Sequence, residues 1–322
     1  MLSRDELLRE AAAARFQAES LEKVHRLIEL LEALRSHPFL KTRIVLKGGT
    51  ALNLFVFDAP RLSVDIDLNY IGAVDRETML SERPKIDEAV QAVCARLGIA
   101  VRRVPGDHAG GKWRLSYTSA LGRPATLELD MNYMLRAPLW PLTVRTSHRI
   151  GSVFATDIAV LDRHELAAGK LAALFSREAS RDLFDAHGLL GRDDLDAERL
   201  RLGFVVYGGF NRTDWRTVRI ENVSVDLKEA QQQLVPLLRV DRVPNPREIE
   251  AWSRRLVEEC RERLSVLLPF RPHELEFLTR LNDHGEVVPE LLTGDSRLRA
   301  IIRSHPGLAW KAQNVREHKP KR

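Results

Sequence analysis

The sequence predicts an α+β fold, with a small mixed sheet and its helices in the first half and a mainly α-helical domain in the second. Short β-type segments alternate with helical patterns up to about residue 150. After that point an apolar repeat of about 3.6 residues, typical of helices, dominates. The 322 residues, 44% of them hydrophobic, are enough for two cores. We therefore expect one domain at residues 1–150 and a second at residues 151–322.

The first domain is predicted to contain helices and strands in a mixed order. Residues 5–36 contain two helical patterns, with four leucines on one face: Leu27, Leu30, Leu31 and Leu34. A strand within residues 42–49 runs into a glycine turn, and a helix at 50–57 follows with Thr50 as its N-cap. The later elements are expected at 62–70 (strand), 84–97 (helix), and 99–104, 112–119 and 124–134 (strands). This order is typical of a small mixed sheet covered by helices.

The second domain is predicted to be helical because amphipathic patterns follow one another closely. These patterns lie at residues 160–190, 223–238, 246–268 and 271–285. We find no repeat of solenoid length and no low-complexity linker between them.

Composition and charge narrow the class of protein. The 50 basic and 45 acidic residues leave a formal charge of +5 and a pI near 9.3, which is compatible with a polyanionic partner without requiring one. The two cysteines, Cys94 and Cys260, have neither a disulfide-framework spacing nor a zinc-site spacing. No stretch has the apolar core of a signal peptide or the length of a membrane span. We expect a cytoplasmic protein without a membrane partner.

Two carboxylates stand close together in the predicted strand at 62–70. On a strand, residues i and i+2 point to the same face, about 6–7 Å apart, so Asp65 and Asp67 can converge on one point. Two unpaired carboxylates there repel each other and lose solvation, whereas a divalent cation removes that penalty. Mg²⁺ is typically held by one or two carboxylates together with substrate phosphates. The pair therefore predicts a magnesium site, although a solvated strand face has the same pattern.

A further acid is expected from the predicted strand at 124–134. There Glu128 and Asp130 share one face, while leucines and a methionine alternate on the other. Either acid can join Asp65 and Asp67 from a neighbouring strand, and we favour Asp130. An acid beside a metal-bound nucleophile can accept its proton as general base. An exposed strand face is again the alternative.

The glycine pair before the predicted helix indicates phosphate binding. Glycines let the backbone approach a phosphate closely, and the amides of a helix N-terminus point toward it. Gly48, Gly49 and Thr50 are therefore candidates for binding a triphosphate. Ser63 precedes Asp65 by two residues and is expected to face the same site. It can bind phosphate or be a modification target, because an added phosphate places about −1.5 to −2 charges beside the metal acids.

These motifs together resemble a known family. A Gly-Gly-Thr turn after a strand, followed by an Asp-x-Asp pair and a strand-borne acid, resembles the nucleotidyltransferase fold shared with DNA polymerase β. With the helical segment KLAALFSREASRDLFDAH, residues 170–187, the pattern is similar to the AbiEii/MenT family of nucleotidyltransferase toxins. The resemblance extends from about residue 40 to the end of the chain. It implies that Asp65 and Asp67 hold Mg²⁺ and that Asp130 is the third acidic position.

The resemblance also identifies a second motif, whose charged residues are Lys170, Arg177, Arg181, Asp182 and Asp185. Lys170 and Arg177 are seven positions apart and fall within about 20° of each other on a helix. Such a cationic face suits NTP binding, with Lys170 on a phosphate and the arginines on phosphate or RNA backbone. Asp182 and Asp185 either orient these cations or take part in the chemistry. Lys170 and Asp182 are included among the expected catalytic residues, and Asp185 among those that bind nucleotide.

Two features of this second motif stay open. If the helix continues past Arg177, then Arg181 shares its cationic face, but Ser180 can instead cap a new helix. A solvated helix face with ion pairs such as Arg181–Asp185 is the alternative to a nucleotide site.

The resemblance implies the function. Family members are toxins of toxin–antitoxin pairs, and those of known activity transfer nucleotides from an NTP, some of them to the 3′ end of tRNA. We expect a Mg²⁺-dependent enzyme that transfers NMP from an NTP to an RNA acceptor, with the tRNA 3′ end favoured. We also expect that a cognate antitoxin restrains it. The alternatives to this function are transfer to a protein or small-molecule hydroxyl, and a catalytically silent nucleotide- or RNA-binding module.

Residues 203–223 mix aromatic side chains with Arg212, Arg216 and Arg219. Such groups either stack on unpaired bases or belong to a core.

Overall fold

The computed structural model describes residues 2–104 and 110–318, and the chain divides into two compact units. Unit 1 comprises Met1–Arg136, Leu142–Leu161 and Val235–Val243, and unit 2 comprises Ala137–Pro141, Asp162–Leu234 and Pro244–Arg322. The domain boundary expected at residue 150 stays a prediction. In the structure, residues 151–161 stay with unit 1, and the segment Val235–Val243 returns to it, where the Leu62 N–H donates to the Leu237 carbonyl at 2.8 Å.

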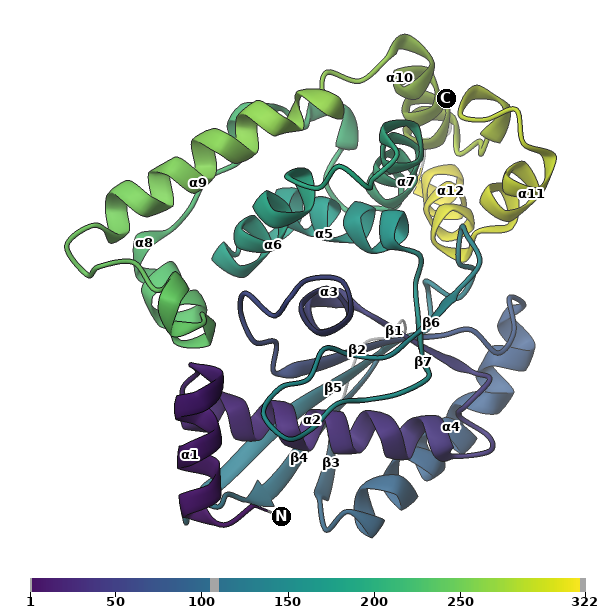
Figure 1. The fold of residues 1–322 in the computed structure, drawn as a ribbon. Coiled ribbons are helices and arrows are strands. Elements are labelled where there is room, and N and C mark those ends of the chain that lie inside the picture. The colour runs from purple at the N-terminus through teal and green to yellow at the C-terminus, as the bar shows by residue number, and fades with distance from the viewer. Residues whose placement is uncertain (1, 105–109, 319–322) are drawn as a thin grey trace. The chain divides into compact units, whose positions relative to one another are not determined.

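Unit 1 is built on a mixed sheet of seven strands within the described residues, which confirms the expected mixed sheet (Figure 1). Its strands, in spatial order, are β3 (Ala100–Val104), β4 (Gly110–Thr118), β5 (Pro124–Asn132), β2 (Asp65–Tyr70), β1 (Ile44–Lys47), β7 (Ile158–Val160) and β6 (Thr143–Arg145). The β2–β5 and β1–β7 pairs are parallel and the other neighbours are antiparallel. Strands β6 and β7 were not predicted, because strands this short give no recognisable alternation.

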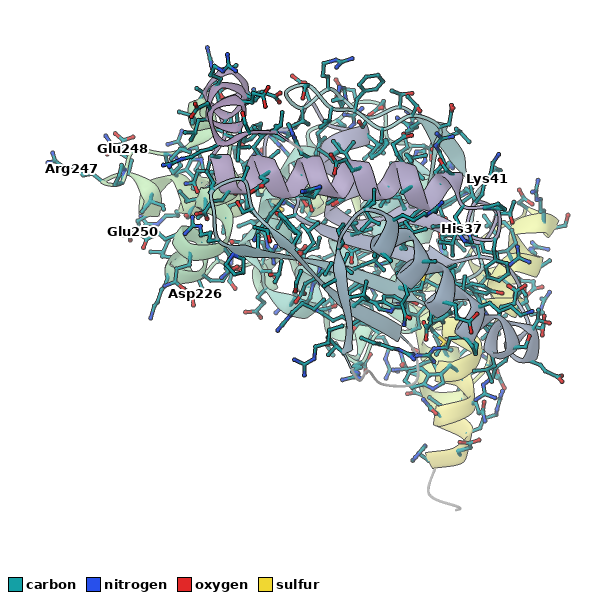
Figure 2. The ribbon with its side chains drawn as sticks, turned by 90° about the horizontal axis from the view of Figure 1, so that it is seen from below. His37, Lys41, Asp226, Arg247, Glu248 and Glu250 are labelled. Carbon is teal, nitrogen blue, oxygen red and sulfur yellow. The ribbon has the colours of Figure 1, made fainter. Side chains whose placement is uncertain are left out.

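Among its described residues, unit 1 also contains four α-helices: α1 (Arg4–Ala14), α2 (Ala18–Ser36), α3 (Gly48–Phe55) and α4 (Arg76–Arg96). Helices α2 and α4 cover one face of the sheet, and α3 packs on the other face over β1 and β2 (Figure 1). Figure 2 shows α2 along its length, with His37 and Lys41 labelled beyond its last residue. Trp113, Leu115 and Leu129 point to the face under α2 and α4 and are fully buried. Because strand residues alternate, the opposite face of β2, β4 and β5 carries polar side chains.

Helix α4 begins earlier than the sequence predicts. The expected start was Pro84, since proline is common in the first turn of a helix. The structure instead starts α4 at Arg76, because Asp75 caps the helix by accepting the Thr78 N–H at 2.8 Å. Pro84 therefore lies inside α4, and the predicted start is wrong.

Unit 2 is mainly helical, as expected. Its helices are α5 (Arg163–Arg177), α6 (Ser180–Leu190), α7 (Ala197–Gly209), α8 (Leu227–Glu229), α9 (Ile249–Arg263), α10 (Pro272–Thr279), α11 (Ser296–Ser304) and α12 (Pro306–His318). The stretch with a helical pattern at 223–238 forms the short α8 and a series of irregular helical turns in place of one regular helix. In the part of the chain that the structure describes, no helix is long and apolar enough to cross a bilayer.

The aromatic residues of segment 203–223 lie in the core of unit 2. Phe204 and Trp215 are 0% exposed, and their ring centroids are 5.1 Å apart. Arg216 is held by Asp214 and Asp283, each at 2.7 Å. Stacking of these two rings on RNA bases is therefore wrong, and the aromatic pattern instead reflects packing around α7.

Candidate active site

A row of charged side chains crosses four strands of unit 1. Lys47 on β1, Asp67 on β2, Asp130 on β5 and Lys112 on β4 are register partners in turn. Partners on adjacent strands lie about 4.5–5.5 Å apart at the backbone, and their side chains point to the same face. The two acids are therefore neighbours, with one lysine on each side of them.

A second row of charges lies on the same face of the sheet. Asp65 of β2 is the register partner of Glu128 of β5, and Glu128 is in turn the partner of Arg114 of β4. Both acids considered for β5 thus reach the Asp-x-Asp pair: Asp130 lies beside Asp67, and Glu128 beside Asp65. The preference for Asp130 as the third catalytic acid stays a prediction.

The two lysines engage the acids to different degrees. Lys112 Nζ lies 2.6 Å from Glu128 Oε2 and 3.8 Å from Asp130 Oδ2. The hydrogen bond to Glu128 raises the pKa of Lys112 above its ordinary value. Burial raises the pKa of Asp130, and the charge of Lys112 opposes that rise. Lys47 Nζ is 3.8 Å from Asp67 Oδ1, which places a cation near this carboxylate without a hydrogen bond.

Helix α3 begins beside these acids. Gly48 has a φ of +73°, and a Cβ there would lie 2.2 Å from Asp67 Oδ2, so glycine is required where the chain passes this carboxylate. Lys47 is the N-cap of α3, and the expected N-cap, Thr50, lies inside the first turn instead. The buried Thr50 hydroxyl donates to the Asp65 carbonyl at 2.5 Å and ties the helix to β2. The first-turn amides, which favour an anion, therefore lie next to the acids.

Ser63 and Arg61 lie against the first turn of α3. A Cβ on Gly49 would lie 2.9 Å from Ser63 Oγ and 3.0 Å from Arg61 Nη2. Both side chains are buried, and Arg61 donates through Nη1 to the Leu62 carbonyl at 2.8 Å. Ser63 is thus beside the glycine pair, and its roles in phosphate binding or as a modification target stay predictions. Arg61 was not predicted, because one arginine in a loop gives no signal until its burial is known.

The second motif forms a buried ion cluster within unit 2. Lys170 on α5 places Nζ 2.7 Å from Asp182 Oδ1 and 3.0 Å from Asp185 Oδ2, both on α6. Arg177 Nη2 lies 3.0 Å from Asp182 Oδ2. The Lys170, Asp182 and Asp185 side chains are 7%, 4% and 0% exposed, whereas that of Arg177 is 64% exposed. A solvated helix face is therefore wrong for the three buried residues.

The helix turns between the two halves of this motif. Helix α5 ends at Arg177, Glu178 adopts a left-handed φ of 52°, and α6 begins at Ser180. Arg181 therefore does not continue the cationic face of α5. The alternative of a new helix is confirmed, but its N-cap is Ala179 and not Ser180. The phosphate-binding role expected for Arg181 stays a prediction.

The acids of unit 1 suit a metal ion that a substrate also binds. Within residues 2–104 and 110–318, no three carboxylate, imidazole or thiolate side chains form a group that could hold a metal by themselves. Mg²⁺ is, however, commonly bound by one or two carboxylates, with phosphate oxygens and water completing its coordination. Asp65 and Asp67 supply such carboxylates on one face of β2, beside helix amides that favour phosphate. The donor set therefore fits a divalent cation shared with a nucleotide.

A mixed sheet with an Asp-x-Asp pair, a neighbouring acid and a glycine-led helix defines the class of protein: it is a nucleotidyltransferase. The sequence matches the family described as "Nucleotidyl transferase AbiEii toxin, Type IV TA system" over residues 29–273. The chain belongs to this AbiEii family of toxins, which confirms the predicted family and enzyme class. Membership implies nucleotide substrates and a cognate antitoxin.

Comparison with solved structures supports the fold. MenT4, a nucleotidyltransferase toxin from Mycobacterium tuberculosis H37Rv, matches with a TM-score of 0.59 at 20% identity, over 96% of this chain and 99% of its own. This match confirms the expected nucleotidyltransferase fold with a helical C-terminal region. JHP933 from Helicobacter pylori matches at 17% identity over 78% of this chain and 95% of its own, with a TM-score of 0.47. A search of curated proteins gave no match.

Proposed function

We propose that this nucleotidyltransferase uses Mg²⁺ to transfer a nucleoside monophosphate from an NTP to RNA, with the 3′ end of tRNA as the acceptor. The observation that supports the proposal is the register of β2 and β5, which sets Asp67 beside Asp130 and Asp65 beside Glu128. Asp67 also adjoins Gly48, where α3 begins. This arrangement offers ligands for a cation and backbone amides for phosphate, which are the two requirements of nucleotidyl transfer.

Each residue of the unit 1 site has a part in this proposal. Asp65 and Asp67 hold the Mg²⁺, which when bound offsets phosphate charge and polarises the phosphoryl group. The amides of Gly48 and Gly49 bind the triphosphate. Asp130 accepts the proton of the acceptor hydroxyl while the hydroxyl oxygen bonds to the α-phosphorus. The bond from that phosphorus to the bridging oxygen breaks, and pyrophosphate leaves with the electron pair.

The charged residues of the second motif, in unit 2, have a proposed role of their own. We assign Lys170, Arg177 and Arg181 to the binding of nucleotide phosphate, because cations stabilise the charge of phosphoryl groups. Lys170 already binds two carboxylates, so Asp182 and Asp185 fix the position of its ammonium group. Arg177 is the most exposed member of the cluster and has the greatest freedom to turn toward phosphate.

The proposed reaction is tested by transfer of label. Purified full-length protein is incubated with Mg²⁺, total cellular RNA and each α-labelled NTP in turn, and we expect label in a tRNA-sized band. Asp67→Asn should lower the rate at least about a thousandfold, because an amide does not replace an anionic metal ligand and several kcal/mol of transition-state stabilisation are lost. Asp58→Asn is the matched control: it makes the same change at a side chain that is 88% exposed and should leave the rate unchanged.

The outcomes separate the site from the acceptor. Label on protein with none on RNA would keep the site and contradict the RNA acceptor. Transfer by Asp67→Asn at the wild-type rate would contradict the site itself. An unfolding temperature equal to that of the wild type would show that a loss of rate in Asp67→Asn is chemical and not a failure to fold.

A further inference from the structure

The sheet face that carries the acids continues onto β4 and β3, where the sign of its charge changes. The row that begins with Asp65 and Glu128 passes through Arg114 of β4 and ends at Arg102 of β3, the register partner of Arg114. The Arg114 side chain is 54% exposed, and Arg102 is exposed as well. Arg102 and Arg114 are called the arginine pair below.

The arginine pair places two cations directly opposite each other on antiparallel strands. Like charges in this position destabilise a sheet. Arg114 forms an ion pair with Glu128 at 3.8 Å. Lys112 binds the same carboxylate more closely, at 2.6 Å. The Arg102 side chain makes no hydrogen bond or ion pair with any residue that the structure describes. An external polyanion would relieve this repulsion.

An arginine on the other face of β3 has an acidic partner. Arg103 follows Arg102 in the chain and points to the face covered by helices, where its Nη1 lies 2.7 Å from Asp87 Oδ2 on α4. The Arg103 side chain is 44% exposed, yet its charge is compensated within the fold. Beyond the arginine pair on the acid face, the next row has short side chains: Ala100, Ser116 and Thr126. They leave that side of the pair open.

The position of the acids sets the direction in which an acceptor strand leaves the site. Helix α3 begins over β1 and β2, where Gly48 adjoins Asp67, and we assign the triphosphate to that side. Asp130 lies on the other side, on β5 next to β4, and receives the proton of the acceptor hydroxyl. The chain that follows this hydroxyl crosses β4 and then β3, at about 4.8 Å per strand. The row of Asp130 continues through Lys112 of β4, and the arginine pair lies in the adjacent row on the same face. A strand that crosses β4 and β3 there lies within reach of the long side chains of the pair.

We propose that Arg102 and Arg114 bind the sugar–phosphate backbone of the RNA acceptor strand next to its 3′ end. This inference rests on the proposed function, since it takes RNA as the acceptor, and it adds where the strand runs. Guanidinium groups bind phosphate oxygens through two parallel hydrogen bonds and carry no base preference. The arginine pair thus positions the strand without selecting its sequence.

The test compares the double variant Arg102→Gln/Arg114→Gln with the wild type, both as full chains. Fluorescence anisotropy measures binding of a labelled single-stranded RNA oligonucleotide over a range of salt concentrations. We expect the Kd to rise about tenfold at low salt and the salt slope to fall by about 1.4, because each phosphate contact on a single strand contributes about 0.7. The KM for NTP should not change. Arg96→Gln, an exposed arginine at the end of α4, is the matched control and should bind RNA as the wild type does.

The outcomes distinguish this inference from the proposed function. An unchanged RNA affinity and salt slope in the double variant would overturn the role of the arginine pair, whether or not RNA is labelled by the enzyme. A raised KM for NTP with unchanged RNA binding would also overturn it, because the pair would then serve the nucleotide. If the wild type labels no RNA but the double variant loses RNA binding with the expected slope, the acceptor reaction fails and the role of the pair in binding RNA stands.

Discussion

The two ion clusters of this chain differ in how their charges are compensated. In unit 1, Asp67 and Asp130 stand side by side on partly exposed strands, and each has a lysine nitrogen at 3.8 Å. In unit 2, Lys170 is buried between Asp182 and Asp185, at 2.7 and 3.0 Å. Loosely compensated carboxylates can exchange a lysine for a metal ion, whereas a buried, tightly bonded cation is held in one place. The difference supports the proposal that the acids of unit 1 bind the metal ion, and it sets them apart from the fixed charge of Lys170 in unit 2.

The largest effect on stability is expected from Lys170→Met, which removes the ammonium group and keeps an aliphatic side chain. Two buried carboxylates then lose the ammonium group, although Arg177 still pairs with Asp182, and we expect the free energy of unfolding to fall by about 3–5 kcal/mol. Lys112→Met is the matched variant in unit 1. Its side chain is 39% exposed, so a loss of about 1 kcal/mol or less is expected. Denaturant unfolding of both variants measures the difference.

A double variant separates buried charge from lost packing in unit 2. In Lys170→Met/Asp185→Asn, one of the two carboxylates left without its lysine is neutralised, so we expect the double variant to be more stable than Lys170→Met alone. If Lys170→Met and Lys112→Met were equally destabilising, the distinction between the buried and the exposed cluster would not hold. The losses of stability in the single variants Lys170→Met and Asp185→Asn could also simply add up in the double variant. That result would show that packing, not charge, stabilises the unit 2 cluster.

The next effect concerns another buried acid of unit 2, Glu165 on α5. Its carboxylate accepts the Leu139 N–H at 3.0 Å and the Tyr207 hydroxyl at 2.9 Å. Burial raises the pKa of Glu165 from 4.5 to about 7. Because this folded-state pKa lies above the unfolded value, the folded protein keeps a proton that the unfolded chain has released. The associated stability is fully present below about pH 4.5 and is lost as the pH rises through about 7.

Glu165→Gln removes this ionisation and keeps the shape of the side chain. We expect the stability of the wild type to fall by about 2–3 kcal/mol relative to the variant between pH 4.5 and pH 8. Denaturant unfolding across that pH range measures both proteins. Tyr207→Phe is the companion variant: it removes a hydrogen bond that lowers the pKa of Glu165, so the loss should move to higher pH. Parallel pH profiles for wild type and Glu165→Gln would contradict the buried proton.

The fold was predictable wherever the hydrophobic residues keep one period over a whole helix or strand. Alternation over β2 and β5 and the helical repeat of α5 placed their elements correctly, because many residues contribute to each pattern. The start of α4 was misplaced because two local rules compete there, and capping by Asp75 prevails over the preference of Pro84 for a first turn. Strands β6 and β7 are so short that they form only by pairing with neighbouring strands, and no local sequence pattern predicts them.

The site was predictable in its acids and not in the cations around them. Asp65 and Asp67 share a face by local alternation, which the sequence displays directly. Lys112 becomes a neighbour of Asp130 only through the register of β4 on β5, and register depends on how distant segments pair. The same holds for Arg114 and Arg102. Sequence reasoning thus finds groups that one strand brings together and misses those that the sheet brings together.

The smallest expected difference lies between two glycine variants and tests whether Asp67 needs the space beside Gly48. Gly48 and Gly122 both have positive φ values, +73° and +79°. A Cβ on Gly48 would overlap Asp67 Oδ2 at 2.2 Å, whereas a Cβ on Gly122 would meet nothing within 4 Å. Gly122→Ala therefore reports the backbone strain alone, about 1–2 kcal/mol. Gly48→Ala is expected to lose about 1–2 kcal/mol more, because Asp67 must shift.

Activity sharpens the comparison between these two glycines. In Gly48→Ala the Asp67 carboxylate is displaced from its present position beside Asp130. We therefore expect label transfer to fall at least about tenfold, because reaction rates depend steeply on small misplacements of the reacting groups. Gly122→Ala should transfer label at the wild-type rate, since it lies in the turn before β5 and away from the acids. If the two variants lost equal stability and kept equal rates, Asp67 would have room to move without consequence. The site would then tolerate displacement of Asp67 from Asp130, and a fixed geometry of these carboxylates could not be the basis of the proposed reaction.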